Sequence, residues 1–452
     1  MTDRVIADGL STGPQPGRAD VDELVVSLCS RLIAFDTTNR GNGDAEGERE
    51  AAEFVAAQLA DAGVEATLLE RSPRRTNVLA RIAGSDPTLP AVLVQGHLDV
   101  VPAEASEWSF APFSGEVRDG YVLGRGATDM KDTVASVLTT VHRWAAEGRQ
   151  PRRDVVLAFV ADEEDKGEDG AHWLVERHRD YFTGIAAAIG ESGGFTHNVG
   201  DLHLYPVGAA ERGTAHLRLT AKGRAGHASR PNDENAVTRL IGALHRIAEH
   251  RWPVALTPAV TAFIEGTGAA LGVEVDLSGE DAVEQTLARL GAAASLAEAT
   301  VRPSATPTVL HAGYKVNVIP GQAVAEVDVR TLPGTEAAVL AQLDRLLGPG
   351  VEREFLTCQE AVSAPIDSPW FAALADALRA EDPAAVVVPY CMGGGTDAKA
   401  FAPLGIDCYG FAPVFVPPGY PYRAMAHGVD ERIPVAGLRF ADRVLDRFLS
   451  TC

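Results

Sequence analysis

The chain has 452 residues, of which 46% are hydrophobic, and this composition is typical of a globular protein long enough for two domains. Its formal net charge of −22 argues against nucleic acid or an anionic membrane as a partner, because phosphate groups bind to basic surfaces. No apolar run is long enough to span a bilayer and no secretory signal is visible, so we expect a cytoplasmic protein.

Strands and helices alternate along the first part of the chain. We expect a flexible leader over residues 1–20, then helices whose apolar residues recur at helical spacing and strands of short apolar runs. The predicted helices cover about 22–32, 47–62, 130–141 and 171–178, and the predicted strands cover 66–69, 77–82, 91–94, 155–160 and 185–189. This alternation predicts an α/β domain with a mainly parallel sheet and helices on both faces.

The texture changes after about residue 207, where a strand alternates apolar and polar residues in the manner of an antiparallel sheet. We expect a smaller two-layer α/β domain over 211–360, inserted between catalytic-domain parts 1–210 and 361–452. Its predicted elements are strands at 214–220, 311–319, 323–330 and 352–356, helices at 235–250 and 336–347, and helical patches within 252–304. A turn at Pro320-Gly321 would join two of these strands. A helix at 370–379, a strand at 386–388 and a helix at 435–449 then complete the first domain.

Acidic and histidine side chains follow the predicted parallel strands at the ends where functional groups gather. A pair of divalent cations needs imidazole and carboxylate ligands and one shared carboxylate. His97, Glu164, Glu191 and His427 have the chemistry of terminal ligands, and Asp129 that of the shared one. Thiolate ligands are not expected, because the five cysteines are scattered without a Cys-x-x-Cys pair.

Two further carboxylates have places beside these ligands. Asp99, two residues after His97, could fix the imidazole tautomer. Glu163 precedes a ligand, so on extended backbone its side chain points the other way, where it could accept a proton from the attacking water.

Each of these features also has a structural explanation. A His-x-Asp pair is often structural, Glu163-Glu164 could belong to a solvated acidic run, and Asp129 could cap a helix. The Gly-Gly-Gly-Thr-Asp segment at 393–397 could be a turn or an anion-binding nest. The combination, in this order and at strand ends, favours a catalytic centre.

Eight segments resemble the metallo-aminoacylase/carboxypeptidase family, which includes acetylornithine deacetylase, succinyl-diaminopimelate desuccinylase, aminoacylase, glutamate carboxypeptidase and carnosine dipeptidase. They are GHLDVVP (96–102), GRGATDMK (124–131), DEE (162–164), GES (190–192), GRAGHAS (223–229), NVIPG (317–321), GGGTDAK (393–399) and AHGVDERI (426–433). The segments stand in family order and span nearly the whole chain.

The resemblance implies two zinc ions per subunit, although cobalt or manganese could serve. One ion would be bound by His97, Asp129 and Glu191, and the other by Asp129, Glu164 and His427, with Glu163 as general base and Asp99 orienting His97. The inserted domain would be a lid that forms a homodimer. Its residues at the substrate would be His227, which stabilises the oxyanion in a partner subunit, Asn317 and Arg330, which grip a carboxylate, and the nearby Gly394, Thr396 and Asp397.

These inferences predict a two-zinc amidohydrolase that cleaves N-acyl amino acids or short peptide-like substrates with a free carboxylate. In the resembling family, a glutamate at the Glu191 position accompanies aminoacylases and deacylases, whereas the long 252–304 stretch argues against a simple desuccinylase. A carboxypeptidase or dipeptidase is the alternative, and a non-catalytic binding protein is disfavoured because every ligand position is filled. An HExxH protease is disfavoured because that motif is absent.

Overall fold

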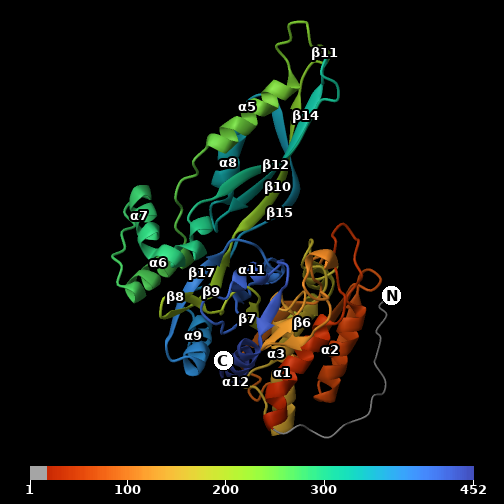
Figure 1. The fold of residues 1–452 in the computed structure, drawn as a ribbon, viewed down its shortest axis with the longest axis vertical. Coiled ribbons are helices and arrows are strands. Elements are labelled where there is room, and N and C mark those ends of the chain that lie inside the picture. Colours follow the sequence, from red (N-terminus) through yellow and green to blue (C-terminus); the bar gives the residue numbers. More distant parts are fainter. Residues whose placement is uncertain (1–17) are drawn as a thin grey trace. The chain divides into compact units, whose positions relative to one another are not determined.

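The structure, a computed structural model, describes residues 18–452 and divides into two compact units (Figure 1). The first unit contains the residues up to Gly208 together with Ala364–Val388 and Thr396–Cys452, and the second contains Ala209–Ser363 and Pro389–Gly395. Most of the predicted leader, residues 1–17, lies outside the described range. Helix α1 begins at Arg18, before the predicted leader ends.

A ten-stranded sheet organises the first unit, with the order β1-β2-β6-β3-β7-β18-β9-β16 and with β8 and β17 paired to β9. Strand β16 and the last residues of β9 and β17 are assigned to the second unit. The centre of the sheet, β6-β3-β7-β18, is parallel, whereas β1, β2 and β9 pair antiparallel to their neighbours. The prediction of a mainly parallel sheet is therefore confirmed. The strands are β1 (Ala66–Glu70), β2 (Thr76–Ile82), β3 (Ala91–His97), β6 (Val155–Val160), β7 (Ile185–Gly190), β8 (His197–Val199), β9 (Leu202–Glu211), β16 (Val362–Ser363), β17 (Ala385–Met392) and β18 (Asp407–Gly410).

Helices cover both faces of this sheet. Leu93 of β3 packs into a core cluster with Leu174 and Phe401, which come from α4 and α10. The neighbouring Val92 and Val94 are equally buried and point to the opposite face, because side chains alternate along a strand. The helices of the unit are α1 (Arg18–Ile33), α2 (Arg49–Asp61), α3 (Lys131–Glu147), α4 (Ala171–Arg177), α9 (Pro369–Glu381), α10 (Ala398–Phe401), α11 (Tyr422–Met425) and α12 (Val435–Thr451).

A small sheet outside the main one joins two distant parts of the first unit. It has the order β19-β5-β4, and β19 pairs antiparallel with β5. Its strands are β4 (Val117–Arg118), β5 (Tyr121–Leu123) and β19 (Arg432–Pro434).

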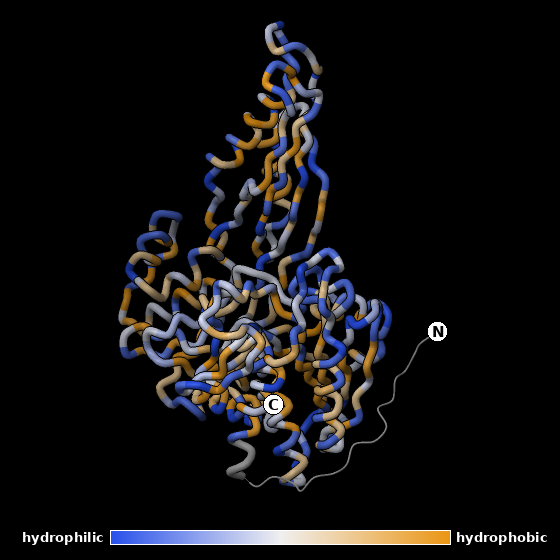
Figure 2. Tube along the Cα trace, turned by 45° about the vertical axis from the view of Figure 1, so that its right-hand side comes forward, coloured by the Kyte–Doolittle hydropathy of each residue, from blue (hydrophilic) through white to orange (hydrophobic). Residues whose placement is uncertain are grey.

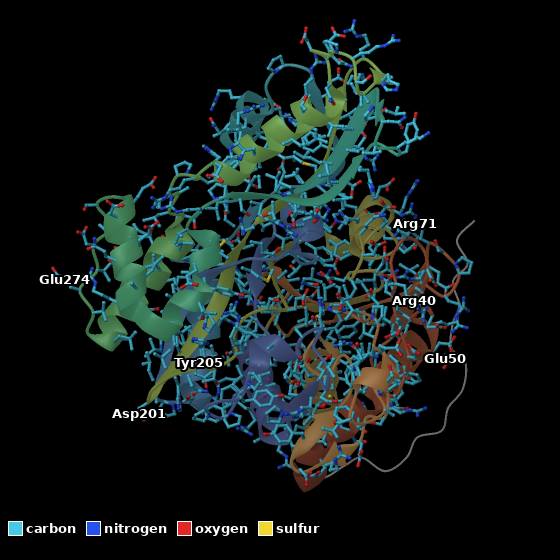
Figure 3. All side chains as sticks on the ribbon, turned by 45° about the horizontal axis from the view of Figure 1, so that its top comes forward. Arg40, Glu50, Arg71, Asp201, Tyr205 and Glu274 are labelled. Carbon is cyan, nitrogen blue, oxygen red and sulfur yellow. The ribbon has the colours of Figure 1, made fainter. Side chains whose placement is uncertain are left out.

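Charged residues in the loops of the first unit, such as Arg40 and Arg71, are exposed, whereas Tyr205 of β9 is fully buried; all three are labelled in Figure 3.

The second unit contains a four-stranded antiparallel sheet with the order β12-β14-β10-β15 and helices α5 and α8 on one face. Leu217 and Val327 face these helices, whereas Arg218 and Glu326 point to the other face. Figure 2 shows hydrophobic and hydrophilic positions following one another along the strands of this unit. The elements are β10 (Gly213–Lys222), β11 (Gly226–His227), α5 (Ala236–Glu249), α6 (Pro258–Leu271), α7 (Glu280–Leu290), β12 (Ser304–Ala312), β13 (Val318–Ile319), β14 (Gln322–Thr331), α8 (Glu336–Leu347) and β15 (Val351–Gln359).

The predicted strand at 311–319 is wrong. Strand β12 ends at Ala312, the backbone turns at Gly313 with a φ of +75°, and Val318–Ile319 pairs with β11 instead of β14. Tyr314 and Val316 fit the alternating apolar pattern of a strand in the sequence, but in the structure they are 83% and 99% exposed. Strand β18 was not predicted, because a four-residue strand carries too little periodicity.

No helix among residues 18–452 is both long and apolar enough to cross a membrane. All five cysteines, which lie among residues 18–452, are free thiols in the structure.

Candidate metal centre

Three neighbouring parallel strands end at one edge of the large sheet and deliver acidic and histidine side chains there. Strand β3 ends at His97, β6 is followed within four residues by Glu163 and Glu164, and β7 is followed by Glu191. Gly190 completes β7 because a Cβ atom at this position would lie 1.8 Å from Nε2 of Gln95. The sheet order β6-β3-β7 therefore gathers side chains that are far apart in the sequence.

Asp129 lies between two histidines and offers one oxygen to each. Its Oδ1 is 3.0 Å from Nε2 of His97, and its Oδ2 is 3.3 Å from Nε2 of His427. Glu191 Oε2 lies 3.8 Å from the His97 nitrogen, and Glu164 Oε2 lies 3.0 Å from the His427 nitrogen. Asp129 does not cap α3, whose N-cap residue is Met130. The arrangement is two carboxylate-histidine sets that share one carboxylate.

The donor set fits divalent cations. The candidate ligand atoms of His97, Asp129 and Glu164 all lie within 4.8 Å of one another, and the same holds for His97, Glu163 and Glu191. Glu164 Oε1 is buried and has no hydrogen-bond partner among residues 18–452. Imidazole nitrogen and carboxylate oxygen are suitable ligands for zinc, and a buried carboxylate oxygen without a donor is one that a cation would satisfy.

Electrostatics in the cluster also favour a cation. Burial and the charge of Glu191 raise the pKa of Glu163 well above its usual value, and burial and the charge of Asp129 raise the pKa of Glu191 to about 7. Burial likewise raises the pKa of Glu164. Bound positive charge would favour the ionised forms and so lower these pKa values.

We expect the metal-free chain to lose stability as the pH rises from about 5 to about 8. The pKa of Glu191 is raised from 4.5 to about 7, so the folded chain keeps a proton that the unfolded chain has released. Hydrogen bonds to Asp129 and Glu164 raise the pKa of His427 from 6.5 to about 10, so the stability that its charge contributes is largest below pH 6.5 and declines as the pH rises from 6.5 toward 10. In both cases the unfolded chain binds fewer protons, and the free energy of unfolding falls with pH.

Thermal unfolding of the metal-free protein at several pH values measures this effect. Added Zn²⁺ should raise Tm more at pH 8 than at pH 5.5, because the metal binds deprotonated ligands. A Tm of the metal-free protein that increases with pH over this range would contradict the expectation.

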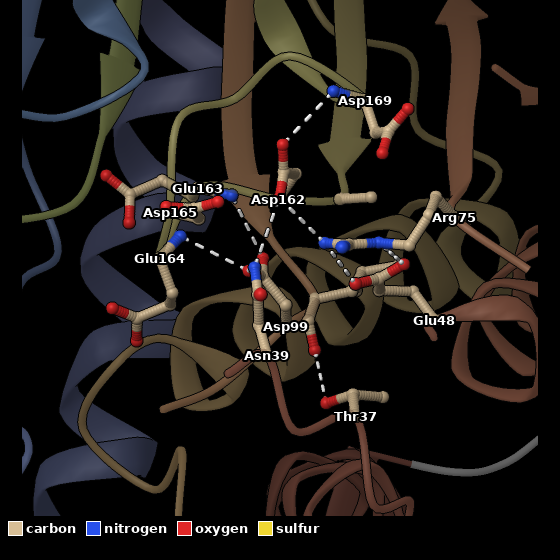
Figure 4. Close-up of polar contacts among 12 residues, drawn as sticks. Thr37, Asn39, Glu48, Arg75, Asp99, Asp162, Glu163, Glu164, Asp165 and Asp169 are labelled. Atoms are coloured by element: carbon tan, nitrogen blue, oxygen red, sulfur yellow. Dashed lines mark hydrogen bonds and ion pairs between the residues drawn. The ribbon is translucent and has the colours of Figure 1, made fainter. Parts of the chain in front are cut away.

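Asp99 organises the loop that carries Glu163 and Glu164 (Figure 4). Its Oδ1 accepts a hydrogen bond from the Glu163 backbone N–H and its Oδ2 from the Glu164 N–H, both at 3.2 Å. Asn39 Nδ2 donates to the same Oδ2 at 2.9 Å. The nitrogen Nδ1 of His97 lies 2.9 Å from the Asp99 carbonyl oxygen and 3.7 Å from its carboxylate. The carbonyl therefore orients the imidazole, while the carboxylate fixes the glutamate loop.

A buried cluster of charged side chains also holds the loop that carries Glu163 and Glu164. Arg75 Nη2 donates to Oδ1 of Asp162 at 3.0 Å and contacts Oε1 of Glu48 at 3.1 Å, and Asn39 also donates to Asp162. Arg75, Glu48 and Asn39 were not among the predicted site residues, and Asp162 was named only as part of the DEE segment at 162–164. The Arg-Thr-Asn segment at 75–77, where β2 begins, carried no sequence signal that its arginine is buried, at 5% exposed.

Backbone strain concentrates around the candidate ligands. Asp162, Ser192 and His427 have φ values of +68°, +69° and +60°. Residues other than glycine rarely adopt this left-handed backbone conformation. The first two residues flank Glu163 and Glu191 in the sequence. Such conformations persist where surrounding contacts determine them, and they cluster at functional sites.

Other predicted site residues belong to the second unit. His227 pairs with Val318 across β11 and β13, and the Asn317 carbonyl accepts a hydrogen bond from the Ala228 N–H at 3.1 Å, so these two predicted residues lie on adjacent segments. His227 is exposed, and its Nδ1 contacts the Ser229 hydroxyl at 2.8 Å.

Arg330 lies on the face of the β14 sheet opposite α5 and α8. Its Nε and Nη2 bind the carboxylate of Asp328 at 2.8 and 3.1 Å, and its Nη1 donates to the Thr214 hydroxyl at 2.9 Å. The guanidinium is therefore held firmly by its own sheet.

The Gly-Gly-Gly-Thr-Asp segment is divided between the units, with Gly394 exposed in the second and Thr396 and Asp397 buried in the first. Thr396 Oγ1 accepts a hydrogen bond from the Ala398 N–H at 3.1 Å. Burial raises the pKa of Asp397 well above its usual value, and the charges of Asp99 and Glu191 act in the same direction. Asp397 is thus one more acidic group of the metal centre's surroundings.

Comparison with known proteins gives matches along most of the chain. The profile of peptidase family M20/M25/M40 matches residues 93–451. N-fatty-acyl-amino acid synthase/hydrolase PM20D1 of Xenopus tropicalis is 29% identical over 365 residues, which are 78% of this chain and 71% of that protein. Human aminoacylase-1 is 29% identical over 358 residues, 77% of either chain. The structure of the M20 family metallo-carboxypeptidase Sso-CP2 from Sulfolobus solfataricus has a TM-score of 0.70 at 18% identity and covers 94% of this chain and 98% of that one.

Proposed function

The chain belongs to peptidase family M20/M25/M40, and is thus a metallohydrolase of amide or peptide bonds; from this premise we propose that it hydrolyses N-acyl amino acids with two zinc ions per subunit. The observation that carries the proposal is the placement of Asp129 between His97 and His427, with one oxygen facing each histidine. A carboxylate shared in this way is the ligand that two adjacent cations require.

On this assignment His97, Asp129 and Glu191 hold one cation and Asp129, Glu164 and His427 hold the other. Two bound cations would polarise the substrate carbonyl and increase the acidity of an attacking water molecule. Glu163, whose carboxylate lies in one cluster with His97 and Glu191, would accept the proton of that water and pass it to the leaving amine. Asp99 keeps Glu163 and Glu164 in place through their backbone N–H groups.

The inserted unit would complete the reaction. We assign oxyanion stabilisation to His227, which would reach the site of a partner subunit in a homodimer. Arg330, fixed by Asp328 and Thr214, would present the outer edge of its guanidinium to the substrate carboxylate, with Asn317 nearby in the substrate site. Gly394, Thr396 and Asp397 would border the pocket for that carboxylate.

The relatives support an N-acyl amino acid as substrate, since PM20D1 and aminoacylase-1 are named for acyl amino acid chemistry. A carboxypeptidase or dipeptidase is the second candidate. It is favoured by a probable carboxypeptidase S-like 2 of Dictyostelium discoideum, which is 27% identical over 368 residues.

A substrate panel tests the proposal. The Zn²⁺-loaded protein should hydrolyse N-acetyl, N-succinyl or long-chain N-acyl amino acids faster than dipeptides, as measured by amine release. The matching N-acyl amino acid amides, which lack the free carboxylate, should have a lower kcat/KM because they lose the grip of Arg330. Faster cleavage of dipeptides would select the second candidate, and hydrolysis that persists after chelation of all metal would exclude both.

A further inference from the structure

Glu431 is a fully buried carboxylate that accepts four hydrogen bonds from residues just before Asp129. Its Oε2 accepts from Nη1 of Arg125 at 2.6 Å and from the Gly126 N–H at 3.0 Å. Its Oε1 accepts from the Thr128 N–H at 2.7 Å and the Thr128 hydroxyl at 2.9 Å. Glu431 is 0% exposed and Arg125 is 3% exposed. A buried ion pair often stabilises a fold no better than apolar side chains of similar volume. We therefore ask which backbone segments the Arg125–Glu431 pair holds in place.

The same glutamate belongs to the segment that carries His427. It lies four residues after that histidine and directly before β19, which pairs with β5. The Glu431 carbonyl also accepts a hydrogen bond from the Gly124 N–H at 2.9 Å. Main chain and side chain of one residue thus fasten the segment of Asp129 to the segment of His427, although the two are about 300 residues apart in the sequence.

The His427 segment is also held by local contacts, such as the hydrogen bond from the Ser109 N–H to the Asp430 carboxylate at 2.7 Å. The side chain of His427 is 55% exposed, and both His427 and Asp430 have positive φ values, of +60° and +57°. Such backbone conformations persist only when neighbouring contacts determine them. Among the contacts that do so here, the network centred on Glu431 leads directly to the Asp129 segment, where it ends one residue before Asp129.

We propose that Glu431 is a positioning residue that sets the separation of Asp129 and His427 and thereby the affinity of the centre for the cation between them. This inference rests on the proposed metal function. The side chain touches neither histidine nor substrate in this role, and it acts only through residues 125–128 and through its own main chain.

Glu431→Gln tests the inference, because an amide cannot serve four donors. In either orientation its NH₂ group faces at least one backbone N–H, of Gly126 or Thr128, which loses its acceptor. Zn²⁺ affinity of the weaker site, measured by competition with a chelating dye, should fall about 10–100-fold. The visible absorption of the Co²⁺-loaded protein should change, and kcat and kcat/KM should fall by the same factor because no substrate contact is removed.

Two milder variants grade the effect and remain informative if Glu431→Gln does not fold. Thr128→Val removes one of the four donors, and Glu431→Asp keeps two anionic oxygens at shorter reach. Zn²⁺ affinity should decrease in the order wild type, Thr128→Val, Glu431→Asp, Glu431→Gln. Wild-type affinity and an unchanged Co²⁺ spectrum in the folded Glu431 variants would overturn the inference.

Asp442→Asn is the matched control. Asp442 is 1% exposed and is paired with Arg143 between α12 and α3, so the variant also breaks a buried ion pair but leaves the metal centre alone. Its Tm should fall while its Zn²⁺ affinity and Co²⁺ spectrum stay at wild-type values, and an equal loss of Zn²⁺ affinity would overturn the specific role of Glu431. If the wild-type protein binds no cation, the proposed function fails instead.

Discussion

Glu163→Gln is expected to lower kcat by about 10²–10⁴-fold while the metal content stays unchanged. The amide is isosteric but cannot accept the proton of the attacking water. Its backbone N–H can still donate to Asp99, so the loop should keep its shape. Steady-state hydrolysis of the best substrate in the panel, together with elemental analysis of the same sample, measures both quantities.

Asp165→Asn is the control for this variant. Asp165 lies in the same loop, is exposed, and contacts the Asn42 backbone N–H. Its kcat should equal that of the wild-type protein. Full activity of Glu163→Gln would remove Glu163 from the role of base, and loss of metal in that variant would show that Glu163 acts as a ligand.

Asp129→Ala is expected to abolish both metal binding and hydrolysis. Each oxygen of Asp129 faces a different histidine, so its removal takes one ligand from each of the two sites. Metal content should fall from about two ions per chain to none after desalting. His427→Ala removes a ligand from one site only and should therefore keep about one ion per chain.

Elemental analysis of the two variants and of Asp119→Asn tests this difference. Asp119 is an exposed acidic residue, with a side chain that is 89% exposed, and its replacement should leave both ions bound. Equal metal content in Asp129→Ala and His427→Ala would contradict the assignment of Asp129 as the shared ligand.

The candidate ligands near β3, β6 and β7 were predictable from the sequence, because functional side chains gather at the carboxyl ends of parallel strands. Continuous apolar runs identified β3, β6 and β7, and the residues just after them are His97, Glu163, Glu164 and Glu191. Their order in the sheet is not written in any one strand, yet parallel strands share an edge, so the residues were expected to meet.

The supporting residues were not predictable in the same way. Arg75 and Asp162 are 87 residues apart and both are buried, whereas sequence patterns suggest exposure for charged side chains. Glu431 lies in the AHGVDERI segment, which was recognised for His427. The four groups that donate hydrogen bonds to Glu431 belong to residues 125–128, about 300 residues earlier in the sequence. The partner of a buried charge depends on tertiary contacts, which periodicity does not encode.

The two histidines of the centre differ in their access to solvent. The side chain of His97 is 1% exposed and that of His427 is 55% exposed. On the proposed assignment, the ion beside His427 would equilibrate with the surrounding solution while the ion beside His97 remained in place. A zinc-loaded protein transferred into cobalt or manganese would then become a hybrid with the second metal at a known position, and the contribution of each ion to turnover could be separated without altering a residue.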